Sequence, residues 1–155
     1  MPEQPVPLTA QGKDRLLAEL GTLREERKAV AERIHHAREL GSSQTDAEYD
    51  DAKTDQGRIE GRILEIEDVL RRAVIIDEDT AHSAARIVVG SGVKVDQDGN
   101  VRHYQIVGPP EADVLKGRIS NDSPVGAALL GKQVGDTVEV NAPRGVIKIK
   151  ILEID

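Results

Sequence analysis

Cysteine, phenylalanine and tryptophan are absent from this chain of 155 residues, and only two tyrosines are present. The absence of cysteine excludes disulfide bonds, zinc–thiolate sites and catalysis by a thiol. Because aromatic side chains are so scarce, any core must be built from aliphatic residues. No apolar run approaches the roughly 18 residues that a membrane helix needs, so we expect no contact with a membrane.

An excess of basic charge is also lacking, since the formal net charge is -7. This acidic balance argues against a general grip on nucleic acid, and we expect no independent sequence-specific binding of DNA. The first ten residues, MPEQPVPLTA, contain neither the basic nor the apolar segment of a signal peptide. These features together predict a cytoplasmic protein.

The chain does contain a two-part apolar repeat between residues 16 and 73. In both halves the seam positions are spaced alternately four and three residues apart, as along one buried edge of a coiled coil. The halves mirror each other about a point near residue 45, which predicts two antiparallel helices. Two polar members, Arg27 and Gln56, are candidates for setting the register of the pair. The seam consists of Leu16, Leu20, Leu23, Arg27, Val30, Ile34 and Ala37, then Ala52, Gln56, Ile59, Ile63, Ile66, Leu70 and Ala73.

The ends of the two helices follow from capping and turn signals. Thr9 is a suitable N-cap for a first helix over residues 10–40. Residues 41–46 read GSSQTD, and such short polar side chains favour a turn over a helix. A second helix should then begin at residue 46 or 47 and end near 72. Residues 41–51, here called the tip, would lie at the end of arms ~40 Å long.

After Ala73 the composition changes to β-branched runs separated by turn signals. We expect a strand at 74–76, a polar stretch at 77–85, and two β-hairpins. A short helix should begin at Pro124 with Ser123 as its cap. The predicted hairpins are 86–95 with 101–107, around Asp98-Gly99-Asn100, and 138–140 with 146–154, around Pro143-Arg144-Gly145.

These elements predict an α+β protein in two parts. Residues 1–75 would form the antiparallel coiled-coil hairpin, and residues 76–85 the linker. Residues 86–155 would form a small antiparallel β domain with one short helix.

Two stretches resemble the Gre factors, bacterial transcription elongation proteins that enter the secondary channel of RNA polymerase. The more specific stretch, residues 119–132, reads ISNDSPVGAALLGK. The other comprises Ala37-Arg38-Glu39 before Gly41, and Ala47-Glu48-Tyr49 after it. The resemblance implies an FKBP-like C-terminal domain that docks on the polymerase core while the hairpin reaches the active site. It also implies a monomer with no active site of its own. The residues that it assigns to docking are Ser123, Pro124, Gly126, Leu129 and Gly131.

The resemblance also implies a chemistry for the tip. In members that stimulate transcript cleavage, the tip reads approximately Gly-Asp-x-x-Glu-Asn-Ala-Glu-Tyr. The Asp and Glu help to hold the second magnesium ion of the polymerase, which activates the water that cuts backtracked RNA. A second divalent ion suits this reaction because it stabilises both attacking and leaving oxygens.

This chain departs from that pattern at both metal-holding positions, where it has Ser42 and Thr45. A neutral hydroxyl is a weaker ligand for Mg²⁺ than a carboxylate and brings no negative charge. We therefore expect the standard route of cleavage to be lost. The preferred interpretation is a regulator that meets the 3′ end of the nascent RNA in the channel and inhibits or pauses transcription.

The alternative is a cleavage stimulator that uses relocated acids. Asp46, Glu48 and Asp50 follow Ser42 and Thr45 and are candidates to share Mg²⁺ or Mn²⁺ with the polymerase. We expect the chain to have no cofactor of its own. The competing interpretation of these acids is a solvated helix start, where negative charge complements the helix dipole. Tyr49 could either pack against the turn or touch the RNA end.

Other interpretations depend on single features. Arg24, Lys28, Arg33 and Arg38 could contact RNA or simply keep the helices soluble. A peptidyl-prolyl isomerase is disfavoured because such sites are lined by aromatic residues and this domain has only Tyr104. A chaperone that holds clients is disfavoured because the tip is polar.

Overall fold

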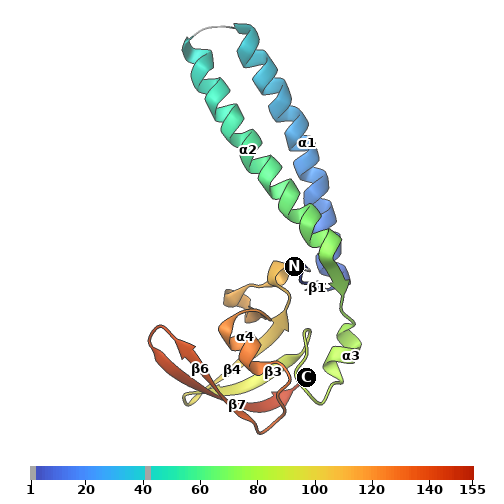
Figure 1. Ribbon diagram of the computed structural model, residues 1–155, viewed down its shortest axis with the longest axis vertical. Helices are drawn as coiled ribbons and strands as arrows, with labels where there is room; N and C mark the ends of the chain where they lie inside the picture. The colour runs from blue at the N-terminus through green and yellow to red at the C-terminus, as the bar shows by residue number, and fades with distance from the viewer. Residues whose placement is uncertain (1–2, 41–42) are drawn as a thin grey trace. The chain divides into compact units, whose positions relative to one another are not determined.

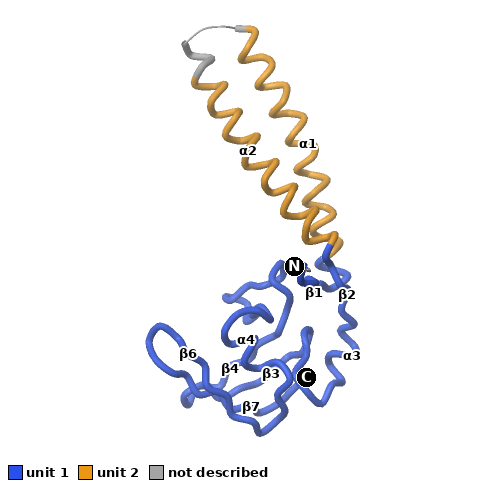
Figure 2. Tube along the Cα trace, in the orientation of Figure 1, with its two compact units in different colours: residues 1–12, 72–155 blue, residues 13–71 orange. Residues whose placement is uncertain are grey.

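The computed structural model describes residues 3–40 and 43–155, without the side chains of residues 40 and 43–46. It divides into two compact units (Figure 2). The hairpin unit comprises residues 13–71, and the β unit comprises residues 1–12 together with 72–155.

Two long helices form the hairpin unit. Helix α1 (Ala10–Leu40) and helix α2 (Ser43–Arg72) run side by side, which confirms the predicted antiparallel hairpin (Figure 1). The apolar seam positions from Leu16 to Ile66 are buried, so the repeat reports the contact surface of the helices correctly. Helix α2 begins at Ser43, three residues before the predicted start, because short polar residues are well suited to a first turn. In the part of the chain that the structure describes, no helix combines the length and apolar character of a membrane span.

Ion pairs between opposite helices flank the seam. The Arg62 guanidinium reaches the Glu19 carboxylate at 2.7 Å, and Arg33 reaches Asp55 at 2.9 Å. Arg27, one of the two polar seam residues, lies 3.7 Å from Glu60 of the other helix. These side chains are substantially exposed, so each pair contributes little to stability. Their value lies in matching complementary charges across the antiparallel pair.

A five-stranded sheet forms the centre of the β unit, and helix α4 packs on it (Figure 1). The strand order is β5-β4-β3-β7-β6. The core between sheet and helix is aliphatic, as the scarcity of aromatic residues requires, and includes Ile106, Leu129 and Ile149. The elements are β3 (Gly92–Gln97), β4 (Asn100–Val107), β5 (Arg118–Ser120), α4 (Pro124–Leu129), β6 (Thr137–Ala142) and β7 (Gly145–Ile154).

The sheet is mixed, so the prediction of an antiparallel domain was wrong in one pairing. Strands β4 and β5 are parallel, with Ile106 opposite Ile119. The segment between them is long enough for a crossover and contains two 3-10 turns, η1 (Pro109–Glu111) and η2 (Val114–Lys116). A tight hairpin would have reversed the chain, whereas this connection returns it in the same direction.

The two predicted β-hairpins are present. Asp98 and Gly99 both have positive φ, 51° and 90°, which is the requirement of a tight primed turn between β3 and β4. The first strand starts at Gly92 and not at residue 86 as predicted. Gly90 adopts a φ of 103°, which interrupts an extended run.

The division between the parts also differs from the prediction of a hairpin over 1–75. Strand β1 (Val6–Leu8) pairs in parallel with β2 (Ala73–Ile75), and this pairing places residues 1–12 in the β unit. The predicted linker, 76–85, contains a short helix, α3 (Glu78–His82). Asp77 caps this helix by accepting the backbone N–H of Asp79 at 3.0 Å.

A pair of adjacent residues tests the seam. Ile63 is 2% exposed and Leu64 is 64% exposed. We expect Ile63→Ala to lower the free energy of unfolding by about 2–5 kcal/mol, since it leaves a cavity between the helices. Leu64→Ala should change it by less than about 0.5 kcal/mol. Urea denaturation followed by helical circular dichroism measures both, and equal losses would show that the seam is misassigned.

Candidate functional site

The tip is only partly described by the structure. Ser42 lies outside the described residues, as do the side chains of Thr45 and Asp46, whose backbones belong to the start of α2. Glu48 and Asp50 are exposed on α2. Two of the three carboxylates predicted to share a metal, Glu48 and Asp50, are therefore accessible to solvent. The hydroxyl residues at positions 42 and 45 are known from the sequence alone.

Tyr49 is held across the hairpin by Arg38. The Arg38 Nη2 donates to the Tyr49 hydroxyl at 3.2 Å, and the guanidinium carbon lies 5.5 Å from the ring centroid. This hydrogen bond, together with the positive charge, lowers the pKa of Tyr49 below its ordinary value. The observed contact of Tyr49 is thus with Arg38 of α1. Packing of Tyr49 against the turn, which lies outside the described residues, and its contact with an RNA end both stay predictions.

The three other basic side chains considered for contact with RNA have acidic partners. Arg24 lies 3.5 Å from Glu67, and Arg33 pairs with Asp55. Lys28 pairs within its own helix with Glu25 at 3.3 Å. Their charges are thus partly balanced within the protein, which agrees with the interpretation as soluble helix faces.

The predicted docking residues lie in and around the loop that leads into α4. Ser123 caps this helix by accepting the Gly126 N–H at 3.1 Å, as the sequence predicts. Pro124 is exposed, whereas Leu129 is fully buried in the core. A Cβ at Gly126 would lie 2.0 Å from the Ser120 carbonyl oxygen. Gly126 and Leu129 are thus buried beneath this region, whereas Ser123 and Pro124 at the start of α4 and Gly131 just after its end are accessible.

An apolar pocket of about 300 Å³ adjoins this loop, and sequence analysis missed it. Ser123 and Pro124 form part of its wall, and Tyr104, whose hydroxyl donates to Gln97 at 2.7 Å, forms another part. The apolar pair Val114-Leu115 in a polar segment is the sequence feature that could have indicated it. Val114 lines the pocket, and Leu115 is 98% exposed. The remaining walls are Ile119, Val125, Val140, Asn141, Ala142, Pro143 and Ile147.

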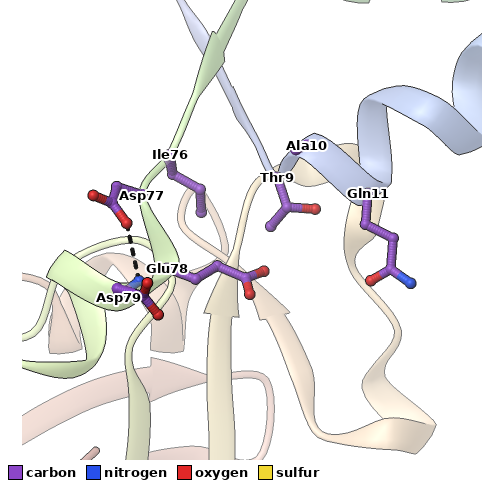
Figure 3. Close-up of a pocket in the computed structure, with 7 residues that line it drawn as sticks. All are labelled: Thr9, Ala10, Gln11, Ile76, Asp77, Glu78 and Asp79. Atoms are coloured by element: carbon purple, nitrogen blue, oxygen red, sulfur yellow. Dashed lines mark hydrogen bonds between the residues drawn. The ribbon is translucent and has the colours of Figure 1, made fainter.

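A second pocket, of about 370 Å³, lies between the start of α1 and the start of α3 (Figure 3). Asp77, Glu78 and Asp79 line one side, and Thr9, Ala10 and Gln11 line the other. Asp77 is already engaged as the cap of α3, and hydrogen bonds from Thr80 and Asp79 lower its pKa. Within the described residues no group of three acidic or histidine side chains is placed to hold a metal ion.

Comparisons with known proteins cover both parts of the chain. The family model described as "Transcription elongation factor, N-terminal" matches residues 6–75. The model described as "Transcription elongation factor, GreA/GreB, C-term" matches residues 82–155. These ranges lie near the division that the sequence predicts, although the compact units divide the chain elsewhere.

Individual relatives match over nearly the whole length. The transcription elongation factor GreA of Chloroflexus aggregans is 50% identical over 157 residues, covering 99% of each chain. GreA of Bacillus cytotoxicus is 43% identical, covering 98% of each chain. Among solved structures, GreA factor homolog 1 of Thermus thermophilus is 35% identical with a TM-score of 0.48, covering 98% of this chain and 99% of that one.

Family models of transcription elongation factors thus match both the helical hairpin and the β unit. The chain belongs to the Gre family of transcription elongation factors, which bind RNA polymerase and act through it. Members of this family have no active site of their own. The isomerase and chaperone interpretations are therefore not needed.

The contact between Arg38 and Tyr49 can be tested by titration. We expect Arg38→Gln to raise the pKa of Tyr49, because a neutral amide no longer stabilises the tyrosinate. Absorbance near 295 nm in a Tyr104→Phe background reports Tyr49 alone, since the chain has only these two tyrosines. Arg24→Gln, further from the tip, serves as the control. A pKa that stays low in Arg38→Gln would disprove the contact.

Proposed function

We propose that this protein stimulates transcript cleavage by RNA polymerase, using tip acids that lie after the usual positions. In this proposal the β unit docks on the polymerase core and the tip enters the secondary channel. The observation that carries the proposal is the match to GreA elongation factors at 43–50% identity over 98–99% of the chain. It favours the alternative of the sequence analysis over inhibition.

The placement of acids along α2 supports this choice. Asp46 and Asp50 are four residues apart, and residues at this spacing share one face of a helix. Asp50 is exposed, and Glu48 adds a second exposed carboxylate to the tip. Carboxylate oxygens are the ligands that Mg²⁺ prefers, and Mn²⁺ accepts the same donors. The role of Asp46 and its neighbours is to contribute negative charge beside the metal of the polymerase.

That shared metal would supply the chemistry in the complex, by activating water and stabilising attacking and leaving oxygens. The protein's own contribution is positional. The buried seam keeps the two helices together, and the contact of Arg38 with Tyr49 ties α1 to α2 near the tip.

Docking is proposed for the exposed part of the loop before α4. Ser123 and Pro124 offer the contact surface there, and Gly131, just after α4, and the neighbouring apolar pocket extend it. The nascent RNA is met only at its 3′ end and only inside the complex, because the overall charge of -7 gives no separate affinity for nucleic acid.

Inhibition is the second candidate, and one observation favours it. Positions 42 and 45 carry neutral hydroxyls where cleavage-stimulating members carry acids. A tip without those ligands would occupy the channel and slow nucleotide addition without promoting cleavage.

The deciding experiment measures RNA cleavage in a defined backtracked complex and nucleotide addition in an active one. We expect shortened RNA with the unaltered protein. Asp46→Asn should reduce the cleavage rate about tenfold or more, since loss of a metal ligand should raise the activation barrier by at least ~1.4 kcal/mol. Glu32→Gln, which changes an exposed acid on α1, should leave the stimulation of cleavage unchanged.

The opposite result is equally informative. No cleavage together with slowed nucleotide addition would establish the inhibitor and reject the proposal. In that case Ser42→Asp combined with Thr45→Glu should create cleavage activity, because it restores the two acids. No effect in either assay, despite binding to the polymerase core, would reject both candidates.

A further inference from the structure

The buried acid Glu111 occupies an unusual position in the β unit. It ends the 3-10 turn η1 and is only 7% exposed. Burying a carboxylate is unfavourable unless hydrogen bonds compensate for the lost water. The compensation comes from the other end of the chain, at the residue that caps α1.

Two hydrogen bonds join Glu111 to Thr9, and a third joins Thr9 to the first turn of α1. The Thr9 hydroxyl donates to Glu111 Oε1 at 2.5 Å, and the Thr9 backbone N–H donates to Oε2 at 3.0 Å. The same hydroxyl oxygen accepts the Gly12 N–H at 2.9 Å. Both oxygens of the Glu111 carboxylate therefore accept hydrogen bonds from Thr9, and Thr9 in turn accepts a hydrogen bond from the helix. We call Thr9, Gly12 and Glu111 the clasp.

The first turn of α1 is adapted to this approach. It contains no acidic residue, although negative charge stabilises the start of a helix. Glu111 supplies that charge from 102 positions away. A Cβ at residue 12 would lie 2.6 Å from the Glu111 carboxyl carbon, so a larger residue there would force this carboxylate to shift. Glycine is a poor helix former. The close approach of Glu111 gives a reason for a glycine in this first turn.

Neighbouring contacts hold the same segment. The Ile76 N–H donates to the Leu8 carbonyl at 3.0 Å, beside the pairing of β1 with β2. At Gly108 a Cβ would overlap the Pro7 carbonyl oxygen, so the chain before η1 also lies directly against β1. The clasp is the polar, charged element of this junction, and it is the one that touches the helix itself.

We propose that Glu111 is a positioning residue for the hairpin. Through Thr9 it fixes the first turn of α1 to the β unit and thereby limits how far the rest of α1, and with it the tip, can swing. Because α1 is continuous from Ala10 to Leu40, control of its first turn is transmitted along the helix. This role lies outside the tip and outside the docking surface.

The first test uses the free protein, without polymerase. Glu111→Gln keeps the shape but cannot accept both donors of Thr9. We expect hydrogen exchange of the Thr9 amide to accelerate about tenfold, as for loss of a bond to a charged group. Thr9→Val, which removes the hydroxyl, should release the Gly12 amide in the same way. Glu153→Gln, an exposed acid of the same unit, should change neither rate.

The swing itself can be measured with paired spin labels. The chain has no cysteine, so Glu32→Cys on α1 and Val134→Cys in the β unit introduce the only labelling sites. We expect the distribution of distances to broaden in Glu111→Gln and Thr9→Val and to stay unchanged in Glu153→Gln. An unchanged distribution in both clasp variants would overturn the proposal. So would unfolding of the β unit in both, since Glu111 would then be a folding determinant only.

A third readout rests on the proposed function. In the cleavage assay, loss of positioning should lower the maximal rate while affinity for the polymerase core stays constant. Weakened affinity with a normal maximal rate would instead indicate damage to the docking surface and would contradict a positioning role. The label and exchange measurements stand even if the unaltered protein does not cleave, so the two proposals fail separately.

Discussion

Burial of aliphatic side chains along one edge of each long helix is the interaction on which the function of this chain depends. Without phenylalanine or tryptophan, the hairpin unit relies on many leucine, isoleucine and alanine contacts in a narrow seam. Each contributes modestly, but the repeat continues over several turns. In the proposed function the tip depends on this seam, because the seam holds together the two helices that lead to it.

Sequence patterns predicted what depends on neighbours along the chain. The four-and-three spacing identified the buried edge from Leu16 to Ile66, and Asp98-Gly99 marked a tight turn through its need for positive φ. The contacts that the sequence could not predict are long-range. The parallel pairs β1–β2 and β4–β5, and the bond between Thr9 and Glu111, join segments with no periodic relation. At the tip, residue types were enough to predict accessible acids. Among the predicted docking residues, only the structure distinguishes the buried Leu129 from the exposed Pro124.

The tip combines family resemblance with local departure. The flanking residues Arg38 and Tyr49 are joined across the hairpin, so the frame around the turn has a defined contact. Within that frame Ser42 and Thr45 stand where the resemblance leads one to expect acids, and Asp46 and Asp50 follow four residues apart in α2. In the proposed function, the negative charge offered to the metal of the polymerase depends on where along α2 these carboxylates lie.

The pairing of β1 with β2 makes the hairpin an insertion in the β unit, since chain on both sides of residues 13–71 belongs to that unit. Folding order follows from this topology. Each long helix is made of local contacts and can form early during synthesis, whereas the sheet needs distant segments. Once the helices have closed, they bring β1 beside β2 and remove most of the loop-closure entropy that this parallel pairing would otherwise cost. The same two helices that carry the tip therefore also serve as the scaffold on which the rest of the chain completes its fold.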